Sequence, residues 1–503
     1  MNSRIILAMN SKYLNEIFQY NPTKNFIEDF KNNIFITYSK FNKLSVLVEK
    51  IFKANGIKEG HTIVVSCSNS WMFVVFFFVS IRMKISILPL TKDLTKVKIL
   101  QLKKLINLEF LVSDYDFTFS SKESKSFFFL YKLNKQDKSI LFLNKFSFEY
   151  IFETSENLSE KKITNIDFNK DFLIVNTSGT TGESKLIFHS LKNIVGAAQS
   201  FINFHNLESN LRLLQVFSMT YMAGILNSIF ISFLSRGTLV LYDEFNALSP
   251  LYFWKNVIDS KSNTIWLAPT MLKAILKLDR NQEINDYKHK IKLFVATSYL
   301  DNKVALSFLK KYFIKPVQTY GLSELLFVSS NTLNNVKNSA GLPIDGVKIR
   351  ISEENEILVK SNFTMKAQID KRNKKKPNNT WFSTGDIGFL DEKGHLAITG
   401  RKKDIIIKGG LNIPVKEIEN LVKGTRIITE AVVVGITDKF YGEKVCLFYT
   451  TKDKKKVSVD RINNLLLKKL PQKFKPDIHV HIEKFSYTLS GKIKKSELTK
   501  KYL

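Results

Sequence analysis

One stretch of small hydroxylated residues with two glycines is suited to binding a polyphosphate. It comprises Thr177, Ser178, Gly179, Thr180, Thr181, Gly182 and Lys185. The glycines let backbone N–H groups approach an anion closely, the hydroxyl groups add hydrogen-bond donors, and the lysine adds positive charge. The apolar run at residues 171–176 comes directly before this loop and predicts a buried strand that holds it.

Taken alone, this loop has other interpretations. A Walker A loop requires Gly directly before the Lys, and here Ser184 precedes Lys185, so that motif is excluded. A surface loop rich in Gly, Ser and Thr would explain the composition without any ligand. The loop therefore predicts phosphate chemistry only in combination with other motifs.

Further motifs follow the loop in a fixed order. They are Thr-Tyr-Gly-Leu-Ser-Glu at 319–324, Ser-Thr-Gly-Asp at 383–386, Gly-Arg-Lys-Lys-Asp at 400–404, Ile-Lys-Gly-Gly at 407–410, Glu-Ile-Glu at 417–419 and Ser-Gly-Lys-Ile at 490–493. Together with the loop they resemble the core motifs of the ANL superfamily of adenylate-forming enzymes, which includes acyl-CoA synthetases. The resemblance extends from about residue 69 to the C-terminal end of the sequence.

The resemblance implies a reaction between ATP and a carboxylic acid. The carboxylate attacks the α-phosphorus to give acyl-AMP and pyrophosphate, and the acyl group then passes to the thiol of coenzyme A or of a carrier-protein pantetheine. Because a carboxylate is already ionised at neutral pH, this chemistry needs electrostatic stabilisation rather than a general base. Lys492 matches the catalytic lysine, which bridges the acyl carboxylate and the α-phosphate. Without its motif, it would be one more lysine in a basic tail.

The same resemblance implies the remaining site residues. Glu324 and Thr177 would supply oxygen ligands to Mg²⁺. The nucleotide would contact the phosphate loop and Tyr320, Gly321, Ser323, Asp386 and Arg401. In this pattern the tyrosine stacks on adenine, while the aspartate and arginine fix the ribose hydroxyls. Lys403 matches the hinge residue, and the thiol-acceptor side comprises Lys408, Gly409 and Gly410.

The sequence says less about the acyl substrate than about the nucleotide. The expected acyl pocket comprises Tyr221, Ala223, Gly224, Ser298 and Leu325. Residues 217–224 lack the acid that amino-acid adenylation domains offer to an α-ammonium group, and burying that group without a partner is costly, so an acid with a neutral tail is favoured. Residues 296–299 read Ala-Thr-Ser-Tyr where acyl-CoA synthetases usually carry Gly-Gly-Ala, and these larger side chains are expected to shorten the pocket.

Alternating strands and helices are expected to position these motifs. Apolar runs rich in β-branched and aromatic residues predict strands at 62–67, 85–89, 110–112, 171–176, 238–242, 264–268 and 291–296. Periodic segments predict helices at 95–106, 191–205 and 303–313, and the apolar run 71–79 predicts a buried helix, too short to span a membrane. The pattern predicts an α/β fold: a large domain, residues 1–400, with parallel sheets flanked by helices, and a small mobile α+β domain, residues 401–503.

Charge and cysteine content narrow the partners. The 503 residues carry a net charge of +30, and residues 401–503 hold 24 basic against 11 acidic residues. This excess favours an anionic partner such as a phosphate group or an acidic carrier protein, although a lysine-rich composition also agrees with an AT-rich coding sequence. With only Cys67 and Cys446 and no secretory signal, a reducing, cytoplasmic location is predicted.

Two alternative functions stay open beside a coenzyme A ligase. An acyl-AMP ligase that loads only an acyl carrier protein would use the same motifs. A non-catalytic basic protein that binds nucleotides or nucleic acid would tolerate the loss of Lys492, and its affinity for nucleic acid would fall steeply with salt. The lysine runs 371–376 and 452–456 lack interleaved aromatic residues, so specific nucleic-acid binding is not expected. The seven scattered histidines do not predict a zinc site.

Overall fold

The chain divides into two compact units. The structure is a computed structural model. It describes residues 11–92, 94–115, 127–133, 140–178, 184–279, 284, 287–298, 300–332, 339–370, 374–375, 377, 380–402, 406–408, 411–413, 415–423, 427–467, 470–487 and 493–502. The first unit comprises Met1–Asn338, Pro343–Lys348 and Lys360–Thr380, and the second comprises Ser339–Leu342, Ile349–Val359 and Trp381–Leu503. The domain boundary expected at residue 400 stays a proposal.

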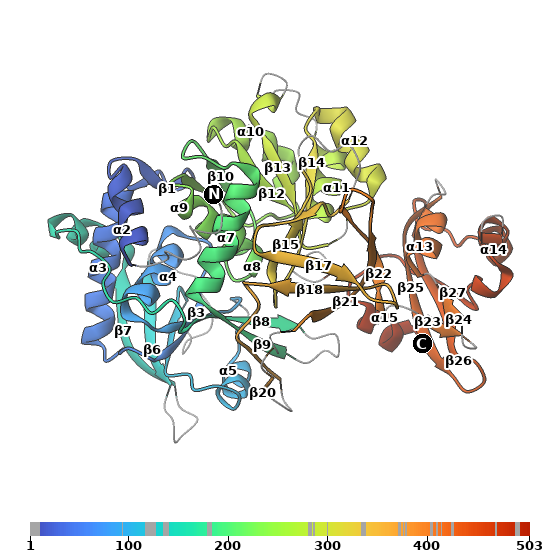
Figure 1. The fold of residues 1–503 in the computed structure, drawn as a ribbon, viewed down its shortest axis with the longest axis horizontal. Coiled ribbons are helices and arrows are strands. Elements are labelled where there is room, and N and C mark those ends of the chain that lie inside the picture. The colour runs from blue at the N-terminus through green and yellow to red at the C-terminus, as the bar shows by residue number, and fades with distance from the viewer. Residues whose placement is uncertain are drawn as a thin grey trace. The chain divides into compact units, whose positions relative to one another are not determined.

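One sheet of the first unit is mostly parallel (Figure 1). Its strands, in the order in which they lie side by side, are β15 (Leu326–Ser330), β14 (Pro316–Leu322), β13 (Lys292–Val295), β12 (Thr264–Leu267), β10 (Arg212–Gln215), β11 (Thr238–Leu241), β1 (Asn25–Asp29) and β2 (Ile34–Thr37). Only the pairs β14–β15 and β1–β2 in this series are antiparallel. The three strands predicted here, at 238–242, 264–268 and 291–296, are confirmed to within one residue at each end.

The second sheet of the first unit contains the strand before the phosphate loop. Its order is β20 (Lys374–Lys375), β19 (Ala367–Ile369), β9 (Ser184–Ser190), β8 (Asp171–Ser178), β4 (Ser86–Pro89), β3 (Thr62–Ser66), β5 (Phe110–Ser113), β6 (Phe127–Leu133) and β7 (Ile140–Ser147). Strands β8, β4, β3 and β5 pair in parallel, whereas β8 and β9 form an antiparallel hairpin. The parallel strands are buried apolar runs, as expected for a sheet covered on both faces.

Helices cover both sheets of the first unit. They are α2 (Ser11–Tyr20), α3 (Tyr38–Ala54), α4 (Trp71–Met83), α5 (Lys96–Lys103), α6 (Phe148–Thr154), α7 (Leu191–His205), α8 (Met222–Gly224), α9 (Ile231–Leu234), α10 (Ser249–Asp259), α11 (Pro269–Leu278) and α12 (Asn302–Tyr312), with a π-helical stretch at Ile225–Phe230. The buried helix predicted at 71–79 is confirmed as α4, in which only Arg82 is not buried. Helix α7 packs against β8 and β9 of one sheet and β15 of the other, so it links the two (Figure 1).

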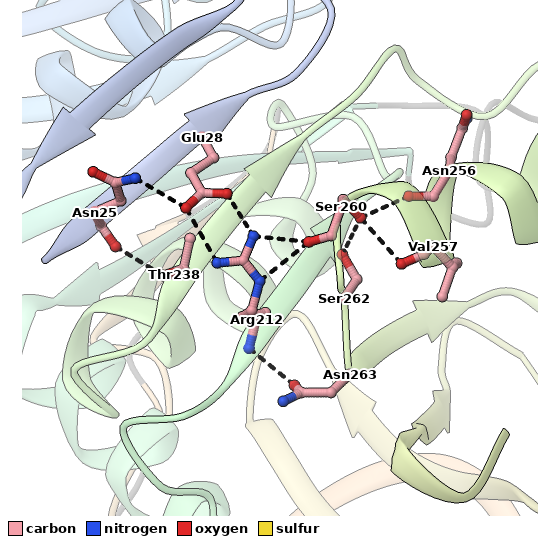
Figure 2. Close-up of polar contacts among 9 residues, drawn as sticks. All are labelled: Asn25, Glu28, Arg212, Thr238, Asn256, Val257, Ser260, Ser262 and Asn263. Atoms are coloured by element: carbon pink, nitrogen blue, oxygen red, sulfur yellow. Dashed lines mark hydrogen bonds and ion pairs between the residues drawn. The ribbon is translucent and has the colours of Figure 1, made fainter. Parts of the chain in front are cut away.

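A buried ion pair fixes the amino ends of the strands in the first sheet (Figure 2). Arg212 at the start of β10 donates to both carboxylate oxygens of Glu28 on β1 and to the backbone carbonyl of Ser260 after α10. Asn25 donates to the same carboxylate at 3.0 Å and accepts from Thr238 through its backbone carbonyl. Because Glu28 is only 6% exposed, these hydrogen bonds replace the water that its carboxylate loses on burial. The members of this network at the starts of β10 and β11 lie at the end of this sheet opposite to the motif of residues 319–324, which follows the end of β14.

Most strand pairs described in the second unit are antiparallel, but its last strand pairs in parallel with its neighbour. Its strands and helices are β18 (Glu356–Ser361), β21 (Phe382–Leu390), β22 (Leu396–Arg401), β23 (Ile406–Lys408), β24 (Leu411–Ile413), α13 (Val415–Lys423), β25 (Ile428–Asp438), β26 (Gly442–Thr451), α14 (Val459–Leu467), β27 (Ile478–His481) and α15 (Lys495–Tyr502). The chain passes between the units within the short strand β16 (Leu342–Pro343), within β17 (Val347–Ile351) and within β18, and also between residues 338 and 339 and between 380 and 381. A sheet of order β24-β23-β26-β25, with β27 on β26, packs against α13 and α14. The predicted α/β fold class, with a small sheet near the C-terminal end, is confirmed.

Candidate active site

The predicted phosphate loop connects the two strands of a hairpin. In the register of β8 and β9, Thr177 lies opposite Lys185, and Ser178 lies opposite Ser184. The side chains of Thr177 and Lys185 are partly exposed at the open end of this hairpin. Residues 179–183, which include Gly179, Thr180, Thr181 and Gly182, lie outside the described part of the chain. The hairpin therefore brings one hydroxyl and one ammonium group of the motif to the same point on the sheet.

The second motif forms the turn between β14 and β15. Thr319 donates through Oγ1 to the carbonyl of Val295 at 3.0 Å, which ties the end of β14 to the end of β13. Tyr320 is 8% exposed. A Cβ atom on Gly321 would lie 2.2 Å from the carbonyl oxygen of Leu326, so only glycine fits this close approach of two strands. The tight hairpin that results presents Glu324 on its turn.

Two hydrogen bonds hold this turn in place, one from β9 of the second sheet and one from the segment before β19. The ring of His189 on β9 lies with Nε2 2.7 Å from the carbonyl oxygen of Ser323, and the N–H of Met365 donates to the carbonyl of Glu324 at 2.7 Å. Burial lowers the pKa of His189 to about 4, so the ring is neutral at pH 7. A carbonyl oxygen can only accept, and Nε2 therefore carries the proton and donates. The sequence showed His189 only as one of seven histidines and gave no sign of this bond.

The first and second motifs consequently lie near each other in the first unit. His189 is four residues beyond Lys185 on the same strand, which corresponds to about 13 Å at the usual rise per residue. The carboxylate of Glu324 is partly exposed and has no hydrogen bond or ion pair with another described residue. One strand thus connects the hydroxyl-rich hairpin to the acidic turn.

Glu324 and Thr177 have the oxygen donors that magnesium prefers. Mg²⁺ takes oxygen ligands, typically one or two carboxylates with the substrate phosphates, and Glu324 offers a carboxylate without a protein partner among the described residues. Thr177 offers a hydroxyl oxygen. Within the described ranges, no cluster of three or more His, Cys, Asp or Glu side chains could hold a metal by itself. The residues present therefore fit a metal that is shared with bound phosphate.

The segment after β13 has a strained backbone. Thr297 adopts φ +77°, a left-handed conformation that is unfavourable for a β-branched residue. Its Oγ1 is buried and makes no hydrogen bond with another described residue. Val295 pairs with Gln318 in the parallel register of β13 and β14. Thr297 and Tyr320 each lie two residues further along, so we expect them to lie at the same level of the sheet. Ser298, expected in the acyl pocket, follows and is exposed, whereas Leu325 is fully buried.

The other residues expected in the acyl pocket lie on the segment before the π-helical stretch. Tyr221 precedes the short helix α8, which contains Ala223 and Gly224. A Cβ atom on Gly224 would lie 2.1 Å from the carbonyl oxygen of Ser218, so the chain folds back tightly on itself here. The sequence did not single out Asn69 as the residue that fixes this fold. It accepts from the N–H of Met219 and donates to the carbonyl of Phe217, both at 2.7 Å.

In the second unit, Asp386 and Arg401 form an ion pair. They lie opposite each other on β21 and β22, with Nε of Arg401 2.7 Å from Oδ1 of Asp386. Gly385 adopts φ +70° and donates its N–H to the carboxylate of Glu356 at 3.0 Å. The Asp386 side chain is 4% exposed, and that of Arg401 is 39% exposed. The third and fourth motifs therefore meet side by side on one sheet.

Several predicted residues lie at or beyond the limits of the described chain. Lys408 lies opposite Leu411 in the pair β23–β24, and its ammonium group forms an ion pair of 2.5 Å with Asp477. Lys403, Gly409, Gly410 and Lys492 fall outside the described residues, so their expected roles stay predictions. Among the helices that are described, none is long and apolar enough to cross a bilayer.

Comparison with protein families and curated proteins supplies relatives for this fold. A model of AMP-binding enzymes matches residues 16–366. The chain is 28% identical over 415 residues to 2-succinylbenzoate–CoA ligase from Lactococcus lactis subsp. lactis (strain IL1403), which covers 73% of this chain and 86% of that protein. It is 27% identical over 355 residues to long-chain-fatty-acid–CoA ligase FadD13 from Mycobacterium tuberculosis (strain CDC 1551 / Oshkosh), covering 66% and 68% of the two chains.

Solved structures share the fold. ATP-bound MatB from Rhodopseudomonas palustris superposes with a TM-score of 0.82 at 18% identity, over 98% of this chain and 99% of that one. The o-succinylbenzoate CoA synthetase MenE from Bacillus subtilis, in complex with its acyl-adenylate intermediate OSB-AMP, gives 0.79 at 20% identity over 97% of each chain. At these identities the likeness concerns the fold alone.

Proposed function

The chain belongs to the AMP-binding enzyme family, and from this premise we propose that it is an ATP-dependent acid–coenzyme A ligase. The observation that most directly supports the proposal is the bond between His189 and Ser323. It connects the strand after the hydroxyl-rich loop to the turn that carries Glu324. A polyphosphate site and a metal-binding carboxylate on adjacent elements are what adenylate formation requires.

In the proposed first step, a carboxylate oxygen of the acid attacks the α-phosphorus of ATP. A P–O bond forms to the acid, the bond to the bridging oxygen breaks, and pyrophosphate leaves with the electron pair. Residues of the phosphate loop, with Thr177 and Lys185, would bind the β- and γ-phosphates. Tyr320 would contact the adenine, and Asp386 would accept from the ribose hydroxyls while paired with Arg401. Lys492 would offset the charge that develops between the two anions.

Magnesium would be held at Glu324, with Thr177 as a second oxygen donor. When bound, it would neutralise phosphate oxygens and so favour departure of pyrophosphate. The chain itself fixes the position of the Glu324 carboxylate. That position depends on the two hydrogen bonds that the carbonyls of Ser323 and Glu324 accept.

In the proposed second step, the thiol of coenzyme A attacks the acyl carbonyl and AMP leaves. Residues 401–503 would rotate about Lys403 between the two steps, so that Lys492 leaves and the segment of Lys408, Gly409 and Gly410 approaches. The relatives named above are coenzyme A ligases, which supports coenzyme A over a carrier protein as the acceptor. The absence of an acidic residue in 217–224 supports an acid with a neutral tail over an amino acid.

Pyrophosphate release tests this function. The purified protein is incubated with ATP, MgCl₂ and a panel of short, long, aromatic and hydroxy acids, each with and without coenzyme A. We expect acid-dependent pyrophosphate and AMP with at least one acid, and a thioester only when coenzyme A is added. Thioester formation on an acyl carrier protein but never on coenzyme A would support the carrier-protein alternative. If no acid released pyrophosphate, the proposal would fail.

A further inference from the structure

The polar junction around His189 lies where three segments of the first unit meet. It comprises the end of β9, the first turn of α7, and the residues 364–365 that lie beside Glu324. His189 is completely buried, and its ring donates from Nε2 to the Ser323 carbonyl. Asn193, in the first turn of α7, donates from its side-chain amide to the carbonyl of Thr364 at 2.7 Å. The bonds from His189 and Asn193 end on the carbonyls of Ser323 and Thr364, which directly precede Glu324 and Met365.

The orientation of the His189 ring is fixed from both sides. The amide of Asn193 lies 3.5 Å from Nδ1, the ring nitrogen that has no proton. The Oδ1 atom of the same amide accepts from the hydroxyl of Ser190, which also caps α7 by accepting from the N–H of Asn193. The amide can therefore point its donors only towards Nδ1 and the carbonyl of Thr364. A ring held in this way presents Nε2–H to one acceptor in one direction.

The bond acts on the backbone next to the proposed metal ligand. Ser323 and Glu324 are consecutive, and their carbonyls accept from His189 and from the N–H of Met365 respectively. The N–H of Leu325 donates to the carbonyl of Leu322, which closes the turn. With both carbonyls fixed, the Cα–Cβ bond of Glu324 has one direction. Loss of a residue that orients a metal ligand without touching the metal commonly lowers metal affinity or activity by about 10- to 100-fold.

We propose that His189 is a positioning residue that holds the Ser323–Glu324 turn where the Glu324 carboxylate can share a divalent cation with the phosphates of ATP. This inference rests on the proposed function, because it assigns a role within the same site. It assigns no proton transfer to the ring, which stays neutral and touches neither substrate nor metal.

Two substitutions at His189 separate the donor from the shape of the ring. In His189→Phe the ring remains and the donor to Ser323 is lost. In His189→Gln the side-chain amide can take the place of Nε2–H and donate to the same carbonyl. The matched control is His205→Phe, since His205 is also a largely buried neutral histidine with one side-chain bond, to Ser330 at 2.8 Å, and it lies at the opposite end of α7.

Three measurements decide the matter. The Mg²⁺ concentration for half-maximal pyrophosphate release and kcat are measured with saturating acid, AMP binding is titrated in EDTA, and the thermal midpoint is recorded. For His189→Phe we expect kcat to fall and the half-saturating Mg²⁺ concentration to rise by about 10- to 100-fold. AMP affinity in EDTA should be unchanged, because AMP binding needs no cation. His189→Gln should recover most of the loss.

A purely structural role would give a different pattern. If His189→Phe lowered the thermal midpoint as much as His205→Phe did and left the Mg²⁺ dependence equal to that of the wild type, the inference would be overturned. Equal losses in the Gln and Phe variants would also overturn it. Lack of acid-dependent pyrophosphate release by the wild type would instead reject the proposed function itself. Should His189→Phe not fold, the comparison of His189→Gln with the wild type still tests the inference, since that variant must retain the Mg²⁺ dependence.

Discussion

Arg401 and Asp386 face each other across two antiparallel strands, with Nε 2.7 Å from a carboxylate oxygen that is almost fully buried. The arginine binds one carboxylate oxygen of Asp386 and so fixes the orientation of that carboxylate. Two residues from separate sequence motifs thereby act as one polar unit.

Replacing Asp386 by Asn should weaken the binding of ATP. The charge that accepts from the ribose hydroxyls would be lost, and charge-assisted hydrogen bonds of this kind correspond to about 10- to 100-fold in KM for ATP. The KM for the acid should change little. Steady-state kinetics of pyrophosphate release test this, with Asp391→Asn as control, because Asp391 accepts only from the nearby turn at Lys393 and His395. Equal KM values in the two variants would contradict the assignment.

Replacing Lys492 by Ala should lower the rate of acyl-AMP formation by about 10²- to 10³-fold, the usual loss for an electrostatic contact to a transition state. Thioester formation from supplied acyl-AMP should stay near the wild-type rate. The matched control is Lys494→Ala. Lys494 is two residues after Lys492, and its ammonium group makes an ion pair with Glu497 at 2.8 Å. Acid-dependent exchange of pyrophosphate into ATP measures the first step. A wild-type exchange rate in the Lys492 variant would remove this lysine from the mechanism.

Replacing Thr297 by Gly should stabilise the protein relative to Thr297→Ala by about 1 kcal/mol. The reason is that φ +77° is strained for any residue with a Cβ atom, while the greater flexibility of unfolded Gly offsets part of the gain. Loss of the side chain should also lengthen the acyl pocket. Urea denaturation measures the first effect, and the ratio of kcat/KM for long and short acids measures the second. Identical behaviour of the Gly and Ala variants would show that the backbone at Thr297 is unstrained.

Replacing Arg212 by Ala should destabilise the first unit without affecting the site. The buried Glu28 would lose its main partner, which usually costs about 3–5 kcal/mol. Lys31→Ala removes an exposed ion pair with Asp243 and should cost less than about 1 kcal/mol. Urea denaturation compares the two variants, and KM for ATP should be unchanged in both. A loss of stability in the Arg212 variant no larger than that of the Lys31 variant would show that the network of Figure 2 contributes little.

Acid should destabilise the first unit partly through His205. Burial lowers its pKa to about 3, below the unfolded value of about 6.5, so the unfolded chain takes up the proton first as the pH falls. The stability that neutral His205 contributes is complete above pH 6.5 and decreases below it, by about 2 kcal/mol at pH 5. His205→Phe should therefore lose about 2 kcal/mol less than the wild type between pH 7.5 and 5. Parallel pH profiles of unfolding free energy would contradict this.

The sequence predicted the regular elements of the fold because their signals are local. Strand and helix periodicity identified β3, β4, β12 and α7 to within one residue, and an unbroken apolar run identified α4. The apolar run 171–176 predicted the strand that forms β8 but not its hairpin with β9, and the motif at 319–324 pointed to Glu324 without predicting that it lies on a turn. The helix expected at 95–106 is shorter, since α5 covers Lys96–Lys103.

Long-range polar contacts could not be predicted in this way. The bond from His189 to Ser323 joins residues 134 positions apart, and that from Arg212 to Glu28 spans 184 positions. A buried histidine in a strand has the same local sequence whether its ring is inert or bonded to a distant turn. The roles of Lys403, Gly409, Gly410 and Lys492 rest on the sequence alone, because these residues lie outside the described ranges.

Helix α7 touches both sheets of the first unit, with Asn193 in its first turn and His205 at its end. An insertion or deletion within this helix would rotate every side chain beyond it by about 100°, and so move His205 relative to Asn193. Efforts to redirect the enzyme to a different acid should accordingly leave the length of α7 alone. Substitutions intended to change the preferred acid are better placed in the short segments after β10 and β13. We expect side chains there to be exchangeable without changing the spacing of the sheets.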